Sequence, residues 1–297
     1  MAPKFILLTA AKNEAAYIGK TIESVSRQTV LPTAWFIVDD GSSDRTAEII
    51  AGYAACYPFI KLRCRPANEG RNFGAKSIAI NAVYQEAMAV DFDFVAIHDA
   101  DIELPLSRYF ECLLCAFDAE PALGISGGYI HERCRGEWKP RPSNSPAAVA
   151  GAVQFFRRSC FPSGYTPLKC GGEDWLAQLD AESLGWRARS QTDLPAYHHR
   201  PTSSADGYLR GLFRLGIRDA SFGSHPLFQV VKCVRRFREQ PYVIAGLIRY
   251  AGYVWYVASG AAPILPIEKI SYLRDQQVKR LRALVQPSGS SALDGRI

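Results

Sequence analysis

The sequence predicts an α/β fold, in which a mostly parallel central sheet is flanked by helices, with a helical extension at its C-terminal end. Through the first hundred residues, short apolar runs alternate with longer segments of helical period. Strands that are apolar on both faces are typical of parallel sheets covered by helices. Beyond residue 200 the pattern becomes helical and basic, which indicates a separate helical part.

The expected elements follow in a regular order. Strands are expected over residues 4–9, 34–38, 60–63 and 93–97, and helices over residues 14–27, from the cap candidates Ser42-Ser43-Asp44 through residue 50, and from Gly70 to about residue 89. Further along we expect a helix over 106–117, strands over 124–130 and 149–156, a loop over 138–146 and a helix over 173–184. These elements divide into a main domain at residues 1–204, a basic, aromatic-rich helical extension at 205–285 and a disordered tail at 286–297.

Composition and charge narrow the class of protein. With 48% hydrophobic and 22% charged residues, the chain can bury a full core. Eight irregularly spaced cysteines and no signal peptide indicate reduced thiols in the cytoplasm. Residues 200–297 carry fifteen Lys and Arg against six Asp and Glu, a net +9, whereas residues 1–199 carry twenty against twenty-three, a net −3. We find no nucleic-acid recognition motif, so an anionic membrane surface or a phosphate-bearing acceptor fits the basic part better.

The tripeptide Asp99-Ala100-Asp101 follows the apolar run at residues 92–98 and precedes Leu104-Pro105, which stops a strand. Carboxylates two residues apart on an extended strand point to one side, and at the carboxyl edge of a parallel sheet that side faces the ligand crevice. Two carboxylates there can hold Mg²⁺ or Mn²⁺, which keeps its other positions for water and phosphate oxygens. The alternative, two solvated loop acids, stays open on this motif alone.

Two more turns are expected at the same edge. After the first strand comes Thr9-Ala10-Ala11-Lys12-Asn13-Glu14, whose small residues let a ligand approach the backbone. After the second comes Asp39-Asp40-Gly41-Ser42-Ser43-Asp44, in which Asp40 can accept a hydrogen bond from a base N–H or a ribose hydroxyl. The alternative is that Asp40 only shapes the turn, and for Asp44 we prefer a helix cap.

With these turns in this order, residues 3–200 resemble the inverting nucleotide-sugar glycosyltransferases of family 2, which have the GT-A fold and are best known from bacterial polysaccharide synthesis. The motifs that carry the resemblance are Asn13-Glu14, Val38-Asp39-Asp40-Gly41-Ser42-Ser43-Asp44, Asn68-Glu69-Gly70, Asp99-Ala100-Asp101 and Gly172-Glu173-Asp174-Trp175. The resemblance implies that Asp40 contacts the base, Asp99 the ribose and Asp101 the metal on the diphosphate. The expected donor contacts are Thr9, Ala10, Asn13, Glu14, Asp40, Asn68, Gly70, Arg71, Asp99 and Ala100.

The chain departs from the family pattern in two places. Ala10 and Lys12 stand where many relatives have a proline and an aromatic residue, so the first turn lacks the aromatic on which a base would stack. Gly74-Ala75-Lys76 stands near the usual Ala-Arg-Asn. Arg71 and Lys76 are candidates for a phosphate contact, but for both we prefer a solvated helix face.

The family's motif points to Asp174 as the general base, with Glu173 as its orienting neighbour or an acceptor contact. The preceding glycines, Gly171 and Gly172, let the backbone come close to a substrate. Both acids would then lie at a helix N-terminus, which favours the ionised carboxylate that a base requires. The alternative is that both acids only cap the helix.

The expected metal ligands are Asp101, Asp99 and His198. In related enzymes a histidine after the last core strand completes the metal shell or touches the diphosphate, and a neutral imidazole is a suitable ligand beside carboxylates. We favour His198 over His199, because an extended backbone turns only one of the two towards the site.

Residues 242–266 are aromatic and apolar, but Arg249 interrupts them, and the apolar stretch that remains is shorter than the ~20 residues that a bilayer requires. Flanked by Arg235, Arg236 and Arg238, this segment suits a helix lying in the interface of an anionic membrane. The alternative is a helical subdomain that packs on the main domain or forms a homodimer.

Together, these observations predict a metal-dependent, inverting glycosyltransferase that acts in the cytoplasm, peripherally at the inner face of the plasma membrane. Its donor would be a nucleotide-diphosphate sugar, its cofactor Mn²⁺ or Mg²⁺, and its acceptor a lipid-linked sugar or a polysaccharide. One alternative is a nucleotidyltransferase of similar fold, against which the chain lacks a Gly-rich, Lys-bearing fingerprint after the first strand. Another is a nucleotide-sugar-binding protein without catalysis, against which Asp99, Asp101 and Asp174 argue.

Overall fold

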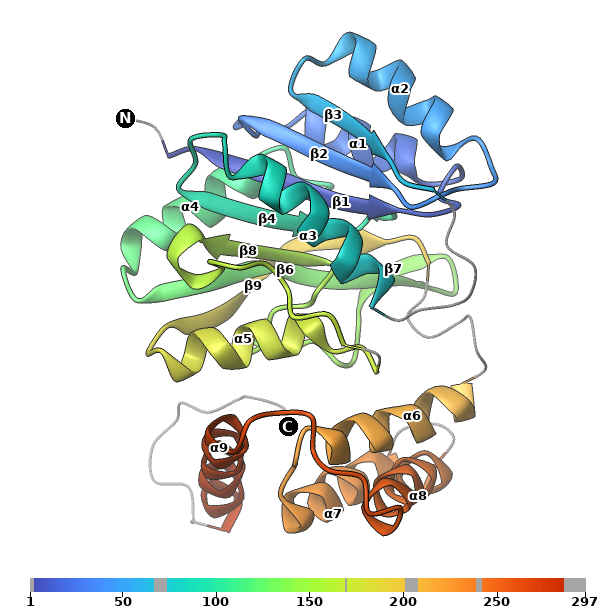
Figure 1. The fold of residues 1–297 in the computed structure, drawn as a ribbon, viewed down its shortest axis with the longest axis vertical. Coiled ribbons are helices and arrows are strands. Elements are labelled where there is room, and N and C mark those ends of the chain that lie inside the picture. The colour runs from blue at the N-terminus through green and yellow to red at the C-terminus, as the bar shows by residue number, and fades with distance from the viewer. Residues whose placement is uncertain (1–2, 67–73, 169, 201–207, 239–241, 286–297) are drawn as a thin grey trace. The chain divides into compact units, whose positions relative to one another are not determined.

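The computed structural model describes residues 3–66, 74–168, 170–200, 208–238 and 242–285. The chain divides into two compact units, Met1–Pro201 and Thr202–Ile297. The first unit is a curled sheet with helices on both faces, and the second is a group of helices (Figure 1). The predicted α/β class with a helical extension is therefore confirmed, while the expected boundary at residue 204 and the expected tail at 286–297 lie outside the described residues.

Four parallel strands form the first half of the sheet, in the order β3-β2-β1-β4. They are β1 (Phe5–Ala11), β2 (Ala34–Asp39), β3 (Ile60–Cys64) and β4 (Phe94–His98). In the centre of this half, Leu8 pairs with Phe36 on one side and Ile97 on the other. Every residue of β2 is buried, because helices cover both faces, and this explains the absence of alternation between apolar and polar residues in its sequence.

The second half of the sheet is mixed. From β4 the order continues through β8 (Val153–Arg157), β6 (Leu123–Cys134), β9 (Arg187–His198) and the short β5 (Ile102–Glu103), while β7 (Glu137–Pro140) forms a hairpin with β6. Strands β6 and β9 are parallel to each other, whereas β8 is antiparallel to both of its neighbours. Within the described residues, nine strands therefore belong to one sheet.

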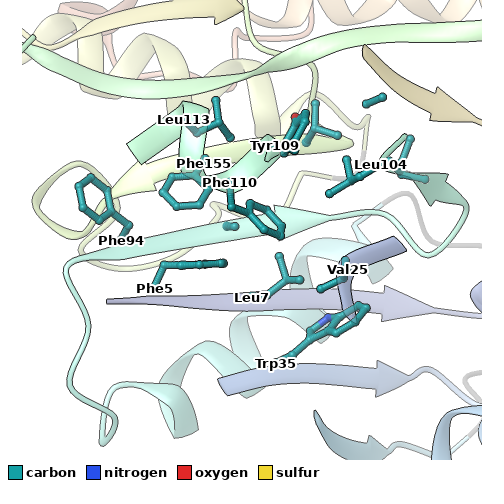
Figure 2. Packing of buried hydrophobic residues seen from close by; sticks show 14 of the residues in the cluster. Phe5, Leu7, Val25, Trp35, Phe94, Leu104, Tyr109, Phe110, Leu113 and Phe155 are labelled. Carbon is teal, nitrogen blue, oxygen red and sulfur yellow. The ribbon is translucent and has the colours of Figure 1, made fainter. Parts of the chain in front are cut away.

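Successive side chains of β1 enter two different cores. Phe5 and Leu7 pack with Trp35 on one face, whereas Ile6 and Leu8 pack on the other. Figure 2 shows the first of these cores, in which Phe5 and Leu7 meet the aromatic rings contributed by neighbouring strands and by helix α4 (Tyr109–Ala119). The helices that cover the faces are α1 (Ile18–Ser26), α2 (Thr46–Cys56) and α4 (Tyr109–Ala119) on the first, and α3 (Ala75–Ala87) and α5 (Glu173–Ser183) on the second.

Two local predictions were wrong. The Asp99-Ala100-Asp101 segment is a turn rather than extended strand, because β4 ends at His98 and the backbone closes through Ile102 N–H to Asp99 O at 3.3 Å. The expected loop at 138–146 begins with β7, since Arg135 and Gly136 both have positive φ and form the tight turn of a hairpin.

The described part of the second unit contains helices α6 (Tyr208–Ser221), α7 (Pro226–Arg235), α8 (Ile244–Ala258) and α9 (Ile267–Val285), with a short 3₁₀ turn at Arg236–Arg238. The first unit has a similar turn at Arg158–Cys160. Helix α8 packs against both α6 and α7. Among the helices of the described residues, none combines the length and the apolar character that spanning a bilayer requires.

Candidate active site

The turns after β1 and β2 are bonded to each other at the carboxyl edge of the sheet. Asn13 adopts a positive φ of 56°, and its Oδ1 accepts a hydrogen bond from Ser43 N at 2.8 Å, while its own N–H donates to Ser42 Oγ at 2.9 Å. The N–H of Glu14 donates to Thr46 Oγ1 at 2.7 Å. The side chain of Asn13 is thus used to join the two turns, and this joint fixes where Glu14 enters the site.

Asp40 lies at the end of β2 and is 4% exposed. Its Oδ1 pairs at 3.0 Å with Nη1 of Arg65, the residue directly after β3. Sequence reasoning did not single out Arg65, although a cation that follows β3 must lie near the end of β2 because the two strands are parallel neighbours. Asp40 therefore has a charged partner in addition to the donor contact expected for it.

Asp99 and Asp101 each lie beside basic side chains. Lys76, in the first turn of α3, forms an ion pair with Oδ1 of Asp99 and donates to the carbonyl of Gly151 at 3.1 Å. Although burial opposes it, the negative charges of Asp99, Asp174 and Asp101 raise the pKa of Lys76. The predicted solvated helix face is wrong for Lys76, because the start of α3 meets the edge of the sheet where these acids lie.

Asp101 contacts two residues near the end of β9: His198, the last residue of the strand, and Arg200, two residues later. Its Oδ2 lies 3.4 Å from Nε2 of His198 and 3.5 Å from Nε of Arg200. On its other side, Nδ1 of His198 lies 3.6 Å from Oε1 of Glu132. Burial disfavours the protonated ring, yet the two carboxylates raise the pKa of His198 to about 9.

The side chain of His199, in contrast, is turned away from that of Asp101, although its backbone N–H donates to the Asp101 carbonyl at 3.0 Å. Its Nε2 lies 2.8 Å from Oε2 of Glu103, and its ring stacks on Tyr17 at 5.5 Å between centroids. Trp138 of β7 meets the edge of the same ring and stacks on Tyr197 at 4.4 Å. The alternation along β9 thus separates the two histidines, with His198 among the carboxylates and His199 in an aromatic group.

Glu14 is a largely buried acid of which only one carboxylate oxygen has a partner among the described residues. Its Oε1 pairs with Arg200, but its buried Oε2 has no hydrogen-bond partner within the described part of the chain. Burial and the neighbouring charge of Asp101 raise the pKa of Glu14 to about 7, against the opposing effect of Arg200. An acid in this state accepts a hydroxyl hydrogen bond readily, which suits the donor contact expected for it.

Asp174 and Glu173 begin α5, directly after two glycines in the left-handed region, Gly171 at φ 72° and Gly172 at φ 99°. Asp174 packs against Gly151 so closely that a Cβ added there would lie 2.5 Å from Oδ2 of Asp174. Glu173 accepts a hydrogen bond from Ser77 Oγ at 3.3 Å, and burial raises its pKa.

Gly151 connects the two groups of acids, since Lys76 binds its carbonyl and Asp174 covers its Cα. Asp99, Lys76, Gly151 and Asp174 are therefore successive neighbours, and Asp101 lies in the same turn as Asp99. The structure brings Glu14, Asp99, Asp101, His198, Glu173 and Asp174 to one edge of the sheet.

Other expected donor contacts are differently placed. Thr9 is fully buried, and its Oγ1 accepts a hydrogen bond from Trp35 Nε1 at 3.0 Å. The methyl group of Ala100 belongs to the core, and its carbonyl accepts from Thr21 Oγ1. Ala10 is partly buried and packs against the second core. The remaining expected contacts, Asn68, Gly70 and Arg71, lie outside the described residues.

The donor atoms around Asp101 fit a divalent cation that is shared with a phosphate ligand. Oδ2 of Asp101 and Nε2 of His198, 3.4 Å apart, can both reach one ion at ordinary bond lengths once the metal has displaced the proton from Nε2. Within the described residues, no group of three or more His, Cys, Asp and Glu side chains forms a complete metal site. Two protein ligands suffice for Mg²⁺ or Mn²⁺, which keeps positions for water and substrate phosphates.

Comparison with known proteins gives one family and several structural neighbours. The family model described as "Glycosyl transferase family 2" matches residues 7–173. A β-monoglucosyldiacylglycerol synthase of Synechocystis sp. is 37% identical over 106 residues, 35% of this chain and 21% of that protein. The probable glycosyltransferase YdaM of Bacillus subtilis is 31% identical over 135 residues, 43% of this chain and 30% of that protein. The matched segments thus span less than a third of either relative.

Two solved structures share the fold. The mannosyltransferase PcManGT of Pyrobaculum calidifontis, in complex with GDP-Man and Mn²⁺, has a TM-score of 0.55 at 17% identity and covers 96% of this chain and 87% of its own. Residues 1–349 of S. aureus TarS, in complex with UDP-GlcNAc, give a TM-score of 0.53 at 15% identity, with 95% and 83% covered.

Proposed function

The chain belongs to glycosyltransferase family 2 and has the GT-A fold, and from this premise we propose that it moves a sugar from a nucleotide-diphosphate donor to a hydroxyl group of a lipid-linked or polysaccharide acceptor. The reaction would be metal-dependent and would invert the anomeric centre. The observation that carries the proposal is the succession of contacts from Asp99 through Lys76 and Gly151 to Asp174, with Asp101 and His198 in the adjoining turn.

On the donor side, Asp101 and His198 would hold Mn²⁺ or Mg²⁺, which when bound neutralises the charge that develops on the leaving diphosphate. Asp99 and Asp40 are left to accept hydrogen bonds from the ribose and the base. Lys76 and Arg200 are positioned to add positive charge beside the phosphates. The complexes of GDP-Man and UDP-GlcNAc with the two structural neighbours support a nucleotide sugar as the donor class.

On the acceptor side, Asp174 would remove the proton of the attacking hydroxyl as its oxygen bonds to the anomeric carbon. The bond from that carbon to the diphosphate oxygen breaks on the opposite face, so the nucleoside diphosphate leaves with the bonding electrons and the configuration inverts. Asp174 lies in the first turn of α5, against the backbone of Gly151. Glu173 is buried beside it and would position the acceptor.

For the acceptor we propose a lipid-linked sugar or polysaccharide reached from the cytoplasmic side of the membrane. The Synechocystis relative, which is named for the synthesis of a glucosylated diacylglycerol, supports an acceptor associated with lipid. The excess of positive charge beyond residue 200 supports peripheral contact with an anionic surface.

A donor panel tests the proposal. The protein is incubated with GDP-, UDP- and dTDP-sugars in Mn²⁺, Mg²⁺ or EDTA, and the products are separated by ion exchange. Sugar transfer or slow donor hydrolysis releases a nucleoside diphosphate only with metal, whereas nucleotidyl transfer would form or consume pyrophosphate. Asp101→Ala should lose metal-dependent donor binding in a thermal-shift assay, while the surface control Asp118→Ala keeps it. If neither the parent protein nor Asp118→Ala binds any of the nucleotide sugars, the proposal is refuted.

A further inference from the structure

Helix α8 carries its large apolar side chains on the outside of the helical unit. Its buried positions are Ala245, Gly246, Arg249, Gly252 and Tyr253. Among its outward residues, Leu247 is 54% exposed and Trp255 is 57% exposed. A surface helix that only packs on a core has the opposite arrangement, with large apolar residues inward and polar residues outward.

Glycines let the inner face of α8 pack closely without bulky side chains. A Cβ on Gly252 would lie 2.1 Å from the carbonyl oxygen of Phe213 in α6, and one on Gly246 would lie 2.3 Å from that of Cys233 in α7. The position of α8 within the unit is therefore fixed by backbone contact, and its exposed side chains are not required for it.

The single charged residue of α8 is also directed inward. Nε and Nη2 of Arg249 bond to Oδ2 of Asp219 at 2.8 and 2.6 Å, and Nζ of Lys232 bonds to Oδ1 at 3.1 Å. Since Arg249 is consumed in this buried group, the outer side of α8 has no formal charge.

Helix α7, which packs against α8, exposes Leu227, Val230 and Val234 in successive turns, followed by the exposed Arg235. Neither helix contains an acidic residue. Across residues 208–238 and 242–285, thirteen Lys and Arg stand against three Asp and Glu, one of which is the buried Asp219. An apolar surface in strongly basic surroundings matches the interface of an anionic bilayer, with acyl chains beneath phosphate groups.

We propose that α7 and α8 form a docking face for an anionic phospholipid bilayer. We define this α7–α8 outer face by Leu227, Val230, Val234, Leu247, Val254 and Trp255. The helices lie in the interface, their apolar side chains enter the acyl region, and the surrounding arginines and lysines meet lipid phosphates. This inference rests on the proposed function for its purpose, because it brings the catalytic unit to a membrane-held acceptor, but the binding itself needs no catalysis.

A second copy of the chain is the less favourable occupant. Pairing two α7–α8 outer faces would bury the apolar residues, but it would also bring two basic units together, and like charges across an interface cost affinity. An anionic bilayer satisfies both the apolar side chains and the charge.

Vesicle flotation with the full-length protein tests the proposal. Vesicles of phosphatidylcholine are compared with vesicles in which phosphatidylglycerol replaces part of it, at low and high salt. We expect binding to the anionic vesicles at low salt, weaker binding at high salt and little binding to the neutral vesicles. Absence of binding to anionic vesicles at low salt overturns the proposal, and sedimentation analysis of the same sample then shows whether a second copy covers the face.

Two pairs of variants locate the contact. Leu247→Ser combined with Trp255→Ser should weaken vesicle binding at least ~ten-fold, whereas Leu31→Ser combined with Leu184→Ser, also two exposed apolar residues but in the first unit, should leave it unchanged. Arg235→Glu should weaken binding about five-fold at low salt, and Lys20→Glu on α1 should not. Equal losses in each pair would contradict a defined face.

The outcomes separate this inference from the proposed function. Donor binding, followed by thermal shift without vesicles, reports on the first unit and should be the same in all four variants. A protein that binds vesicles but no nucleotide sugar would overturn the proposed transferase activity and leave the docking face intact. The reverse result would overturn only the docking face.

Discussion

The two units bury charge in opposite ways. Among the described residues of the helical unit, Asp219 is the one buried acid, and it is bonded to two cations, Arg249 and Lys232, and to the amide of Gln229. Burial alone would raise the pKa of Asp219, yet these cations hold it far below its ordinary value. In the sheet unit, Glu14 keeps an oxygen that has no partner among the described residues, and its pKa is raised to about 7.

The distribution of apolar side chains differs in the same way. Among the large apolar side chains that are exposed in the described residues, four lie in the sheet unit and fifteen in the helical unit. The sheet unit therefore leaves charge incompletely matched at one edge, where ligand groups can complete it. The helical unit matches its buried charge internally and leaves apolar surface outside. Unmatched polarity marks the candidate active site, and unmatched apolar surface marks the candidate docking face.

The largest effect is expected from Asp174→Asn. If Asp174 is the base, the amide cannot take the acceptor proton, and kcat should fall by about 10³-fold while the donor KM changes little. The control is Glu48→Gln, an exposed acid of the same unit whose partner Arg45 is also exposed. Full activity of Asp174→Asn would remove that residue from catalysis and would leave the sheet edge as a binding site only.

The helical unit should respond in its stability rather than in its chemistry. Asp219→Asn leaves Arg249 and Lys232 buried together without a counter-charge, and we expect a loss of about 3 kcal/mol in the free energy of unfolding of that unit. Urea unfolding followed by the fluorescence of Trp255, with the other tryptophans replaced, measures this loss. Donor binding by the sheet unit should be unaffected. If Asp219→Asn is as stable as the parent, the matched group is not what holds α7 and α8 together.

Glu14→Gln should change the free energy of unfolding in the opposite direction, as an increase. Because the folded state raises the pKa of Glu14 from 4.5 to about 7, this side chain contributes stability that is present below pH 4.5 and lost as the pH rises through about 7. Without metal, we expect Glu14→Gln to be more stable than the parent at pH 8 by on the order of 2 kcal/mol, and the difference to shrink at pH 5. Thermal unfolding in EDTA at the two pH values measures it, and a variant that is destabilised at pH 8 contradicts the unmatched state of Glu14.

The sequence was sufficient for the features that local pattern encodes. Three of the four parallel strands, β1, β2 and β4, are mostly apolar runs. Asp40 follows β2, and Asp99 and Asp101 follow β4, so their arrival at one sheet edge could be expected from topology. Gly171 and Gly172 likewise indicated the tight turn before Asp174, and both have positive φ.

The partners of these acids could not be predicted in the same way. Lys76, Arg65 and Arg200 lie 23, 25 and 99 residues from Asp99, Asp40 and Asp101 respectively, and nothing in their local sequence distinguishes them from solvated residues. Strand β9 was missed because six of its first seven residues are polar or charged, and most of its residues are at least partly exposed. Such pairings depend on the tertiary arrangement of segments that are far apart in the chain.

The smallest effect is expected on the Mn²⁺ affinity of the donor-free protein, in which the charge of Lys76 partly neutralises the nearby acids. Lys76 pairs with Asp99 and is close enough to Asp101 and Asp174 for their charges to raise its pKa. Its positive charge therefore opposes the binding of a divalent cation at Asp101 when no diphosphate is present. Lys76→Met should raise the affinity of the donor-free protein for Mn²⁺ about five-fold, the factor expected from ~1 kcal/mol of Coulomb energy, as measured by the electron paramagnetic resonance of unbound Mn²⁺.

Lys76→Arg, which keeps the charge, and Lys20→Met, which removes a lysine from the exposed surface of α1, are the controls and should leave Mn²⁺ affinity unchanged. The same Lys76→Met variant should bind the nucleotide sugar less tightly, because a positive charge beside the phosphates is lost. Tighter Mn²⁺ binding together with weaker nucleotide-sugar binding would show that Lys76 opposes the metal when it is alone and favours the diphosphate. The metal and the diphosphate would then bind best together. Weaker Mn²⁺ binding in Lys76→Met would instead mean that Lys76 holds Asp99 in the geometry that the metal requires.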